Sequence, residues 1–269
     1  MGDSDERALR LELDLIYRQV RKVGFHLLQL DIRRARWMAV AVLSRMSDDI
    51  RLALHNSRKV TCEYCGWEGN SFYVMNVPSG NRYNVQCRRC GSMDRYRLLL
   101  MYLRQTTGFF SQRARVLDIS PAPPFQKMCL AQENLNYVSI DLSSSLAMIR
   151  ADITRLCFAD DSFDVVICYH VLEHVRDDVR AIREVHRVLS PNGLAILQVP
   201  ISERLEETVE YGKPREAECG HVRTYGRDYP LRLRSAGFEV HEDDFAFQLN
   251  RETIERYGVT PERIFVVRK

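Results

Sequence analysis

Residues 115–125 read RVLDISPAPPF. Apolar and branched residues run into Asp118, and a turn that contains three prolines follows at once. A strand that ends in an acidic residue and a tight loop is typical of a site for a nucleotide-type cofactor. Such loops are normally rich in glycine, because only glycine lets a backbone come close to a ligand. This loop has no glycine, so it is either a cofactor loop built by other means or the remains of one.

From about residue 98 onward, short apolar stretches alternate with stretches of helical periodicity. A helix is expected over residues 175–189, because apolar side chains recur on one face and the Ser-Pro-Asn-Gly at 190–193 stops it. Alternation of this kind predicts a doubly wound α/β sheet. The expected strands are 116–119, 137–141, 165–169, 195–199, 238–241 and 264–267.

Two aspartates follow expected strands in succession. Asp118 closes the first strand, and Asp141 closes the second, 23 residues later. In sheets of this kind an acidic side chain at the second position commonly binds the vicinal hydroxyls of a ribose. The alternative is that both aspartates simply terminate their strands.

The order of these features resembles the class I S-adenosylmethionine-dependent methyltransferases, particularly the type 11 group. The resemblance rests on SFDVV at 162–166, HVLEHV at 170–175 and REVHRVLSPNG at 183–193, and it extends roughly over residues 114–269. It implies an enzyme with a Rossmann-like, mostly parallel sheet of seven strands and S-adenosylmethionine as the methyl donor.

The resemblance also assigns the first loop to the methionine part of the cofactor. The family's loop reads roughly Asp-x-Gly-x-Gly-x-Gly, whereas Ser120, Ala122 and Pro124 stand at the glycine positions here. Proline is tolerated at the first helical position, and a prolyl loop is rigid. Because a decayed site would be expected to lose Asp118 and Asp141 too, we interpret the loop as rebuilt.

Further cofactor contacts follow from the same resemblance. Asp152 would approach the adenine amino group, and Ile153 would lie against the ring. Tyr169, His170 and Leu172 would line the floor beside the sulfonium. For His170, packing within the domain is the alternative role.

A second unusual segment, residues 218–238, reads ECGHVRTYGRDYPLRLRSAGF. It is similar to a segment of methyltransferases that also carry an N-terminal zinc ribbon and a glycine-poor first loop. We expect Arg223, Tyr225 and Tyr229 to contact an anionic or planar acceptor at the carboxyl ends of the strands. The alternative is an ion-paired helix cap in which Asp228 pairs with Arg223 or Arg227.

Methyl transfer from a sulfonium is an in-line displacement that depends mainly on positioning and exclusion of water. A hydroxyl acceptor generally needs a base, and His170 and His221 are the candidate catalytic residues for that role. Metal ligation by the pair His170 and His174 is not expected without carboxylates nearby.

Two Cys-x-x-Cys pairs, Cys62 with Cys65 and Cys87 with Cys90, are each followed by glycine. Four thiolates form a closed tetrahedral site, so this spacing predicts a structural Zn²⁺ in a ribbon with a short β-hairpin between the pairs. Redox chemistry of the cysteines is the alternative, and two Cys-x-x-Cys pairs of this kind fit it poorly. The metal would stand in for a core that about 40 residues cannot supply alone.

The chain is expected to have three parts: an N-terminal helical segment at 1–57, the zinc ribbon at 58–98 and the methyltransferase domain at 99–269. The helical segment would pack on the domain, mediate dimerisation or lie on a membrane, and packing is favoured. No apolar run approaches the ~20 residues of a membrane span, and the first residues lack the apolar stretch of a signal peptide. A cytoplasmic protein is therefore expected.

Charge is distributed unevenly, since residues 1–115 hold 20 Lys and Arg against 11 Asp and Glu. Three functions remain open. The leading one is methylation of a small molecule such as a sugar or a natural-product intermediate. The second is methylation of RNA, docked on ribbon arginines. The third is a non-catalytic cofactor-binding scaffold. The docking arginines would be Arg88, Arg89, Arg95 and Arg97.

Overall fold

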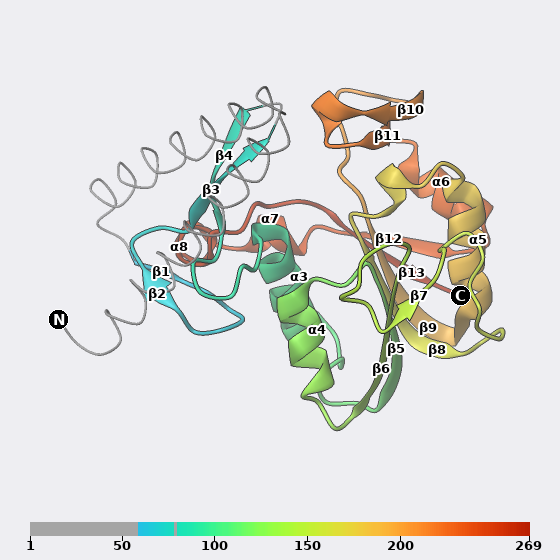
Figure 1. Ribbon diagram of the computed structural model, residues 1–269, viewed down its shortest axis with the longest axis horizontal. Helices are drawn as coiled ribbons and strands as arrows, with labels where there is room; N and C mark the ends of the chain where they lie inside the picture. The colour runs from blue at the N-terminus through green and yellow to red at the C-terminus, as the bar shows by residue number, and fades with distance from the viewer. Residues whose placement is uncertain (1–58, 78–79) are drawn as a thin grey trace, which may run out of the picture. The chain divides into compact units, whose positions relative to one another are not determined.

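A computed structural model describes residues 59–77 and 80–269 of the chain. Within these residues the chain divides into two compact units (Figure 1). One unit comprises the ribbon residues up to Arg97 together with 251–259, and the other comprises 98–250 together with 260–269. The expected N-terminal helices at 1–57 lie outside the described residues.

A seven-stranded sheet forms the centre of the larger unit, with the strand order β12-β13-β9-β8-β5-β6-β7. Neighbouring strands run parallel except for β13, which is antiparallel to both β9 and β12. The predicted fold class, a mostly parallel Rossmann-like sheet of seven strands, is thus confirmed. The strands are β5 (Ala114–Ile119), β6 (Leu135–Asp141), β7 (Ile149–Arg150), β8 (Phe163–Tyr169), β9 (Leu189–Gln198), β12 (Glu239–Asp243) and β13 (Ile264–Arg268).

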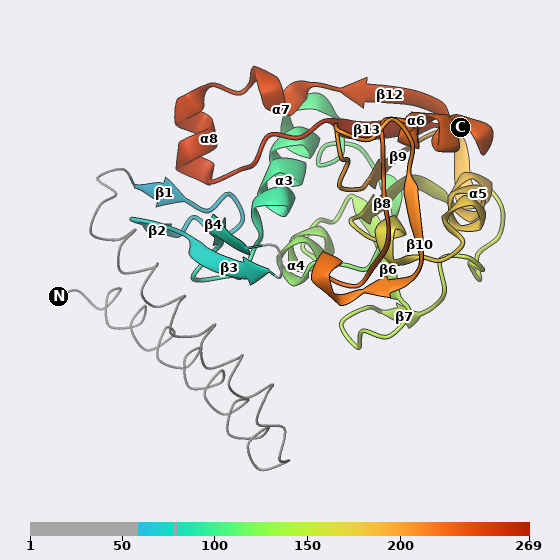
Figure 2. The same cartoon turned by 90° about the horizontal axis from the view of Figure 1, so that it is seen from above.

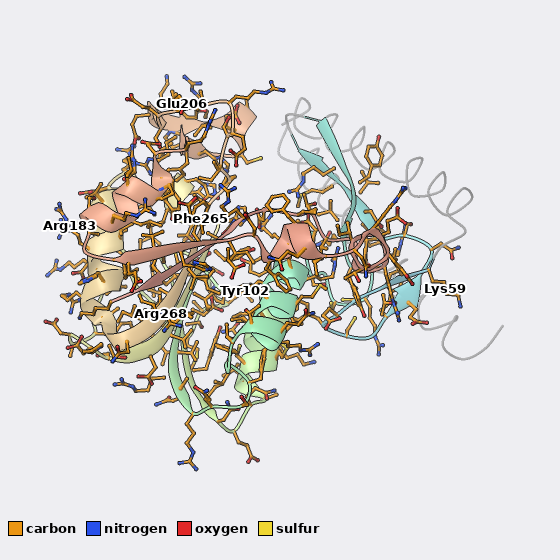
Figure 3. The ribbon with its side chains drawn as sticks, turned by 180° about the vertical axis from the view of Figure 1, so that it is seen from behind. Lys59, Tyr102, Arg183, Glu206, Phe265 and Arg268 are labelled. Atoms are coloured by element: carbon orange, nitrogen blue, oxygen red, sulfur yellow. The ribbon has the colours of Figure 1, made fainter. Side chains whose placement is uncertain are left out.

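Helices cover both faces of this sheet. Figures 1 and 2 show α3 and α4 on one face and α5 and α6 on the other. Figure 3 shows Arg183 on the outer side of α5 and Phe265 within β13. The buried residues of these strands are mostly apolar, as expected for a parallel sheet covered on both sides, with Asp118, Ser139 and Gln198 as buried polar exceptions. The helices are α3 (Asp94–Thr106), α4 (Pro123–Leu130), α5 (Asp178–Val188), α6 (Tyr229–Ser235) and α7 (Phe245–Gln248).

Between β9 and α6 the chain forms a hairpin that the sequence pattern did not predict. Strand β10 (Val209–Arg215) pairs antiparallel with β11 (His221–Thr224), and the one-turn helix η2 (Glu216–Glu218) lies between them. Another one-turn helix, η1 (Leu172–His174), follows β8. Because most of β10 is exposed and polar, it lacks the apolar alternation by which a strand is recognised.

The smaller unit contains the predicted ribbon. Strand β1 (Val60–Thr61) pairs with β2 (Glu68–Gly69), and β3 (Tyr73–Val77) pairs with β4 (Gly80–Gln86). The second pair is the predicted hairpin between the two Cys-x-x-Cys pairs, which is confirmed. Helix α8 (Arg251–Tyr257), taken from the expected methyltransferase region, packs on β1 and belongs to this unit.

Arg97 holds the smaller unit together. Its guanidinium is fully buried and donates to the carbonyl oxygens of Val85, Ser92, Tyr257 and Gly258 at 2.6–2.9 Å. It therefore joins the ribbon to the residues that follow α8. Arg97 is unavailable for docking RNA, which removes one of the four arginines on which that alternative rested.

Candidate functional site

The turn after β5 is built without glycine and contains one residue of left-handed conformation. Ser120 takes a left-handed conformation with φ of +59°, a region that glycine normally occupies. Its N–H donates to the Ile140 carbonyl at 2.8 Å, which joins the turn to β6. Helix α4 then begins at Pro123, with Ala122 as its extended N-cap residue. The prolines occupy the first helical positions, where no N–H is needed.

Asp141, at the end of β6, lies beside this turn. Its Oδ1 accepts the N–H groups of Ser143 at 2.8 Å and Ser144 at 2.6 Å. Partial burial acts to raise the pKa of Asp141, but these hydrogen bonds outweigh it and hold the pKa below its ordinary value. The carboxylate is therefore kept ionised at the carboxyl edge of the sheet.

Asp118 has a different environment from Asp141. It is 3% exposed, and its Oδ2 accepts the hydroxyl of Tyr137 on the adjacent strand at 2.6 Å. Burial raises the pKa of Asp118 to about 7, although the Tyr137 bond acts to lower it. Asp118 thus supports the turn from within the domain.

The region after β6 contains an exposed apolar patch that the sequence analysis missed. Leu142, Leu146 and Met148 are each more than half exposed and follow Asp141 closely in the chain. Exposed apolar side chains gathered in this way commonly mark a binding surface. The signal in the sequence is a leucine directly after the aspartate that ends the second strand.

The predicted adenine contacts differ in their exposure. Asp152 is exposed, and its Oδ1 accepts both the N–H and the hydroxyl of Thr154, at 2.8 and 2.9 Å. Ile153 is 6% exposed and packs in the main core. Because Ile153 is buried, it can line the predicted adenine site only from beneath the surface of the domain.

The floor residues lie at the end of β8. Tyr169 and Leu172 are buried, and the Tyr169 hydroxyl donates to Glu262 at 2.9 Å. His170 has a φ of +58°, and its Nδ1 lies 3.3 Å from Glu173. Burial acts to lower the pKa of His170, but its contacts with Glu173 and Glu262 outweigh this and raise it.

His221, on β11, lies next to His174, which follows β8. The two ring centroids are 4.8 Å apart and the rings are nearly perpendicular. Burial lowers the pKa of His221, and the neighbouring His174 lowers it further. Glu173 completes this group, and the sequence analysis missed it although it directly precedes His174.

Part of the chain is similar to known proteins. The family model of the methyltransferase domain, type 11, matches residues 100–197. These residues are just over a third of the chain, and over this segment it matches a methyltransferase domain. An uncharacterized methyltransferase from Mycolicibacterium gilvum is 31% identical over 36% of this chain and 44% of its own length. The 27-O-demethylrifamycin SV methyltransferase of Amycolatopsis mediterranei is 35% identical over 41% of this chain and 42% of its own length.

A solved structure shares the fold of the methyltransferase domain. The structure of the 4+2 cyclase SpnF covers 64% of this chain and 80% of its own, with a TM-score of 0.50 and 18% identity. At this identity the likeness concerns the fold alone. The chain spans less than half the length of the two curated relatives described above.

In the methyltransferase domain, Arg223, Tyr225 and Tyr229 are buried rather than open to an acceptor. Tyr225 donates to Asp178 at 2.7 Å, and Tyr229 donates to the Leu197 carbonyl at 2.8 Å. Their predicted role as substrate contacts therefore receives no support from the geometry.

The structure is closer to the alternative prediction for residues 218–238, an ion-paired helix cap. The ion pairs, however, form between other residues than expected. Arg223 pairs with Glu210 at 3.0 Å and with Asp178 at 3.5 Å. Asp228 lies 3.9 Å from Arg232 instead of pairing with Arg223 or Arg227.

A cavity of about 610 Å³ opens beside Glu262, the residue that accepts the Tyr169 hydroxyl. Its lining includes Gln198 at the end of β9, Ile201 after it, and Glu262 and Phe265 around the start of β13. Because β13 runs antiparallel to β9, its first residues lie at the same edge as the end of β9. A cavity of about 630 Å³ lies instead at the opposite edge, around residues 190–194.

In the ribbon, the four cysteines come together. Each can offer a sulfur, and these atoms all lie within 4.8 Å of one another. The Gly66 N–H donates to the Cys62 carbonyl and the Gly91 N–H to the Cys87 carbonyl, and both glycines have positive φ. The glycine after each pair thus closes a tight turn, as predicted. The four are Cys62, Cys65, Cys87 and Cys90.

No helix in the described part of the chain has the length and apolar character needed to cross a bilayer.

Proposed function

We propose that this chain transfers a methyl group from S-adenosylmethionine to a small-molecule acceptor by in-line displacement. The observation that carries the proposal is the turn after β5, in which the left-handed Ser120 donates its N–H to Ile140 on β6, next to the ionised carboxylate of Asp141. The demethylrifamycin relative, named for a small-molecule acceptor, supports the acceptor class.

The cofactor would lie along the carboxyl edge of the sheet. Asp141 would bind the ribose hydroxyls, because its carboxylate is ionised and partly exposed. Ser120 and Ala122 would face the methionine part. Asp152 would approach the adenine amino group, with Leu142 as a further apolar contact for the ring.

The buried members of the predicted set would act by shaping this crevice. Ile153 would lie beneath the adenine, and Leu172 and Tyr169 beneath the sulfonium. Asp118 would brace the turn through Tyr137. The chain's task in the reaction is to hold the nucleophile and the methyl carbon in line, at about 3–3.5 Å, and to exclude water.

The acceptor would enter the 610 Å³ cavity beside Glu262. Its volume is within the range of small-molecule sites. A sugar or a natural-product-like compound with a hydroxyl group would need a base, for which His170 and His221 are the candidates.

We further propose that the ribbon cysteines hold a structural Zn²⁺. Four thiolates at knuckle turns are the donor set of closed, tetrahedral zinc sites. The Arg89 N–H lies 3.4 Å from the Cys87 sulfur, which is the kind of backbone hydrogen bond that stabilises a bound thiolate.

Calorimetric titration with S-adenosylmethionine tests the proposed function. Wild-type protein is expected to bind tighter than roughly 100 μM, which corresponds to about −5.5 kcal/mol. Asp141→Ala is expected to weaken binding by roughly 10- to 100-fold, because a hydrogen bond to a charged group contributes about 1.5–3 kcal/mol.

Asp160→Ala is the matched control. This carboxylate is exposed, precedes β8 at the opposite edge of the sheet and pairs only with the surface residue Arg187 among the ion pairs of the described residues. Its removal is expected to leave the affinity unchanged. Wild-type protein that fails to bind the donor would refute the proposal.

A further inference from the structure

Glu173, His174 and His221 form a cluster at the carboxyl edge of the sheet. Each can offer one ligand atom, and the three atoms lie within 4.8 Å of one another. Glu173 and His174 belong to η1, directly after β8, and His221 begins β11. The cluster therefore joins two segments that are 47 residues apart in the sequence. All three residues belong to the larger unit.

Glu173 has an oxygen without a partner. The residue is 1% exposed, and one oxygen, Oε1, lies 3.3 Å from Nδ1 of His170. The other oxygen, Oε2, is buried and has no hydrogen-bond partner among the described residues. A buried carboxylate oxygen without a donor is costly, and such groups are normally paired or bound to a metal.

The two imidazoles are placed where a ligand could reach both. Their ring centroids are 4.8 Å apart, and His174 is exposed whereas His221 is half-buried. One side of the cluster is thus closed by Glu173, and the other is open to solvent through His174. An ion held there would keep coordination positions for water or another ligand.

Arg223 fixes the geometry of the cluster. Its guanidinium donates to the carbonyl oxygens of Leu172, Val175 and Arg176 at 2.5–2.8 Å. These bonds hold the backbone on both sides of Glu173 and His174. Arg223 lies two residues after His221 on the same strand, so it sets the distance between η1 and β11. The cluster is therefore preorganised.

We propose that Glu173, His174 and His221 bind a divalent transition-metal ion, for which Zn²⁺ is the probe. Two imidazoles and one carboxylate are the donor set of metal sites that keep open positions, with zinc or iron as the usual ions. His170 contacts the carboxylate of Glu173 from behind and acts as the positioning residue. The carboxylate that the pair His170 and His174 was thought to lack is Glu173.

A role for this ion rests on the proposed function. An acceptor hydroxyl bound at an open position would lose its proton to water, because the ion stabilises the alkoxide. The oxygen then forms a bond to the methyl carbon, the carbon–sulfur bond breaks, and its electron pair stays on sulfur. The products are a methyl ether, S-adenosylhomocysteine and a proton. The ion would favour oxygen acceptors over carbon acceptors.

Metal analysis of the full chain tests the site directly. Wild-type protein dialysed against Zn²⁺ and then against metal-free buffer is expected to retain one more equivalent than the double variant His174→Ala with His221→Ala. Cys62→Ser with Cys87→Ser removes a different equivalent, that of the ribbon. His241→Ala, an exposed histidine outside the cluster, is the matched control and is expected to retain as much metal as wild type.

Calorimetric titration with Zn²⁺ adds a graded measurement. His170→Asn is expected to weaken binding roughly 10- to 100-fold, as for residues that orient a ligand. Asparagine is chosen because it tolerates the left-handed conformation at this position. If the double variant unfolds, His174→Ala alone, which changes an exposed side chain, provides the comparison.

Equal metal content and equal Zn²⁺ affinity in wild type and the His174 variants would overturn the inference. Donor binding in the same preparations separates this failure from that of the proposed function. Protein that binds S-adenosylmethionine but no additional ion refutes only the metal site. Protein that binds the ion but no donor supports the metal site and refutes the methyltransferase activity.

Discussion

Ser120 and His170 have nearly identical left-handed backbone conformations, with φ of +59° and +58°, at the ends of the adjacent parallel strands β5 and β8. The chain leaves β5 toward α4 on one face of the sheet and leaves β8 toward α5 on the other. These two residues therefore flank the point where the sheet's winding reverses, which is where ligands bind in open α/β sheets. Neither is glycine, and each accepts a backbone conformation that costs about 1–2 kcal/mol.

Ser120 is expected to lower the free energy of unfolding and to strengthen the binding of S-adenosylmethionine. Ser120→Gly relieves the left-handed strain and is expected to leave the free energy of unfolding unchanged or to raise it by up to about 1 kcal/mol. Ser120→Ala keeps the strain and is expected to be the less stable of the two. Both variants lose the Ser120 hydroxyl, which helps to hold the pKa of Asp141 low, so both are expected to bind S-adenosylmethionine several-fold more weakly. Urea unfolding and calorimetry measure the two effects, and equal stability of both variants would exclude strain at this position.

Asp118 is expected to make stability depend on pH. Its pKa is raised by burial from 3.8 to about 7. Between those pH values the folded chain holds a proton that the unfolded chain has released, so this group's contribution to the free energy of unfolding falls as pH rises from about 4 to 7. Above pH 7 the contribution is constant, at a loss of a few kcal/mol.

The variant Asp118→Asn keeps an acceptor for Tyr137 and does not titrate. The difference in unfolding free energy, wild type minus variant, is therefore expected to decrease across this window. Urea unfolding at a series of pH values between 4 and 8 measures it. A difference that stays flat would show that Asp118 is ionised throughout.

Zinc removal is expected to unfold the ribbon. Cys62→Ser with Cys87→Ser takes one thiolate from each knuckle and is expected to lose one metal ion per chain and the protection of the ribbon from proteolysis. Metal analysis and limited proteolysis provide the measurements. The matched control is Cys157→Ser with Cys219→Ser, which changes two exposed cysteines outside the cluster. Full metal content in the double knuckle variant would argue against a zinc ribbon.

Arg97→Lys is expected to destabilise the smaller unit although it preserves the charge. A lysine ammonium cannot span the four carbonyl oxygens that the planar guanidinium reaches. Carbonyl groups left buried without a donor cost about 1–3 kcal/mol each, so a loss of at least about 2 kcal/mol is expected in urea unfolding. Arg89→Lys, at an exposed position, is expected to be neutral. Similar behaviour of the two variants would contradict the anchoring role.

The sequence patterns predicted the sheet well and the hairpin poorly. Six strands of the central sheet follow apolar stretches such as 165–169, because a strand buried on both faces must be apolar throughout. Strand β7 is only two residues long and exposed, and β10 is polar, so neither leaves such a pattern. The region from 190 to 193, expected to be a turn, continues as β9 with Asn192 at positive φ.

The site was predictable in its aspartates and less so in its arginines. Asp141 stands out because an acidic residue ends an apolar strand. Arg97 and Arg223 look like surface or ligand-binding residues, since arginine is rarely buried, yet both are buried and donate to backbone carbonyl groups, and Arg223 also pairs with Glu210 and Asp178. Only the folded chain shows those acceptors. Glu173 was visible in the sequence, but its unpartnered oxygen is a property of its surroundings.

Because β13 runs in the reverse direction, the residues proposed to bind the donor and those proposed to bind the acceptor come from different parts of the chain. The strand ends that would bind the donor lie before residue 175, whereas the wall around Glu262 is formed by residues that precede the last strand. If the acceptor occupies that wall, exchange of residues 260–263 between relatives would change which compound is modified and leave donor affinity intact. Selectivity for the acceptor would then change among relatives without a change in the residues that bind the donor.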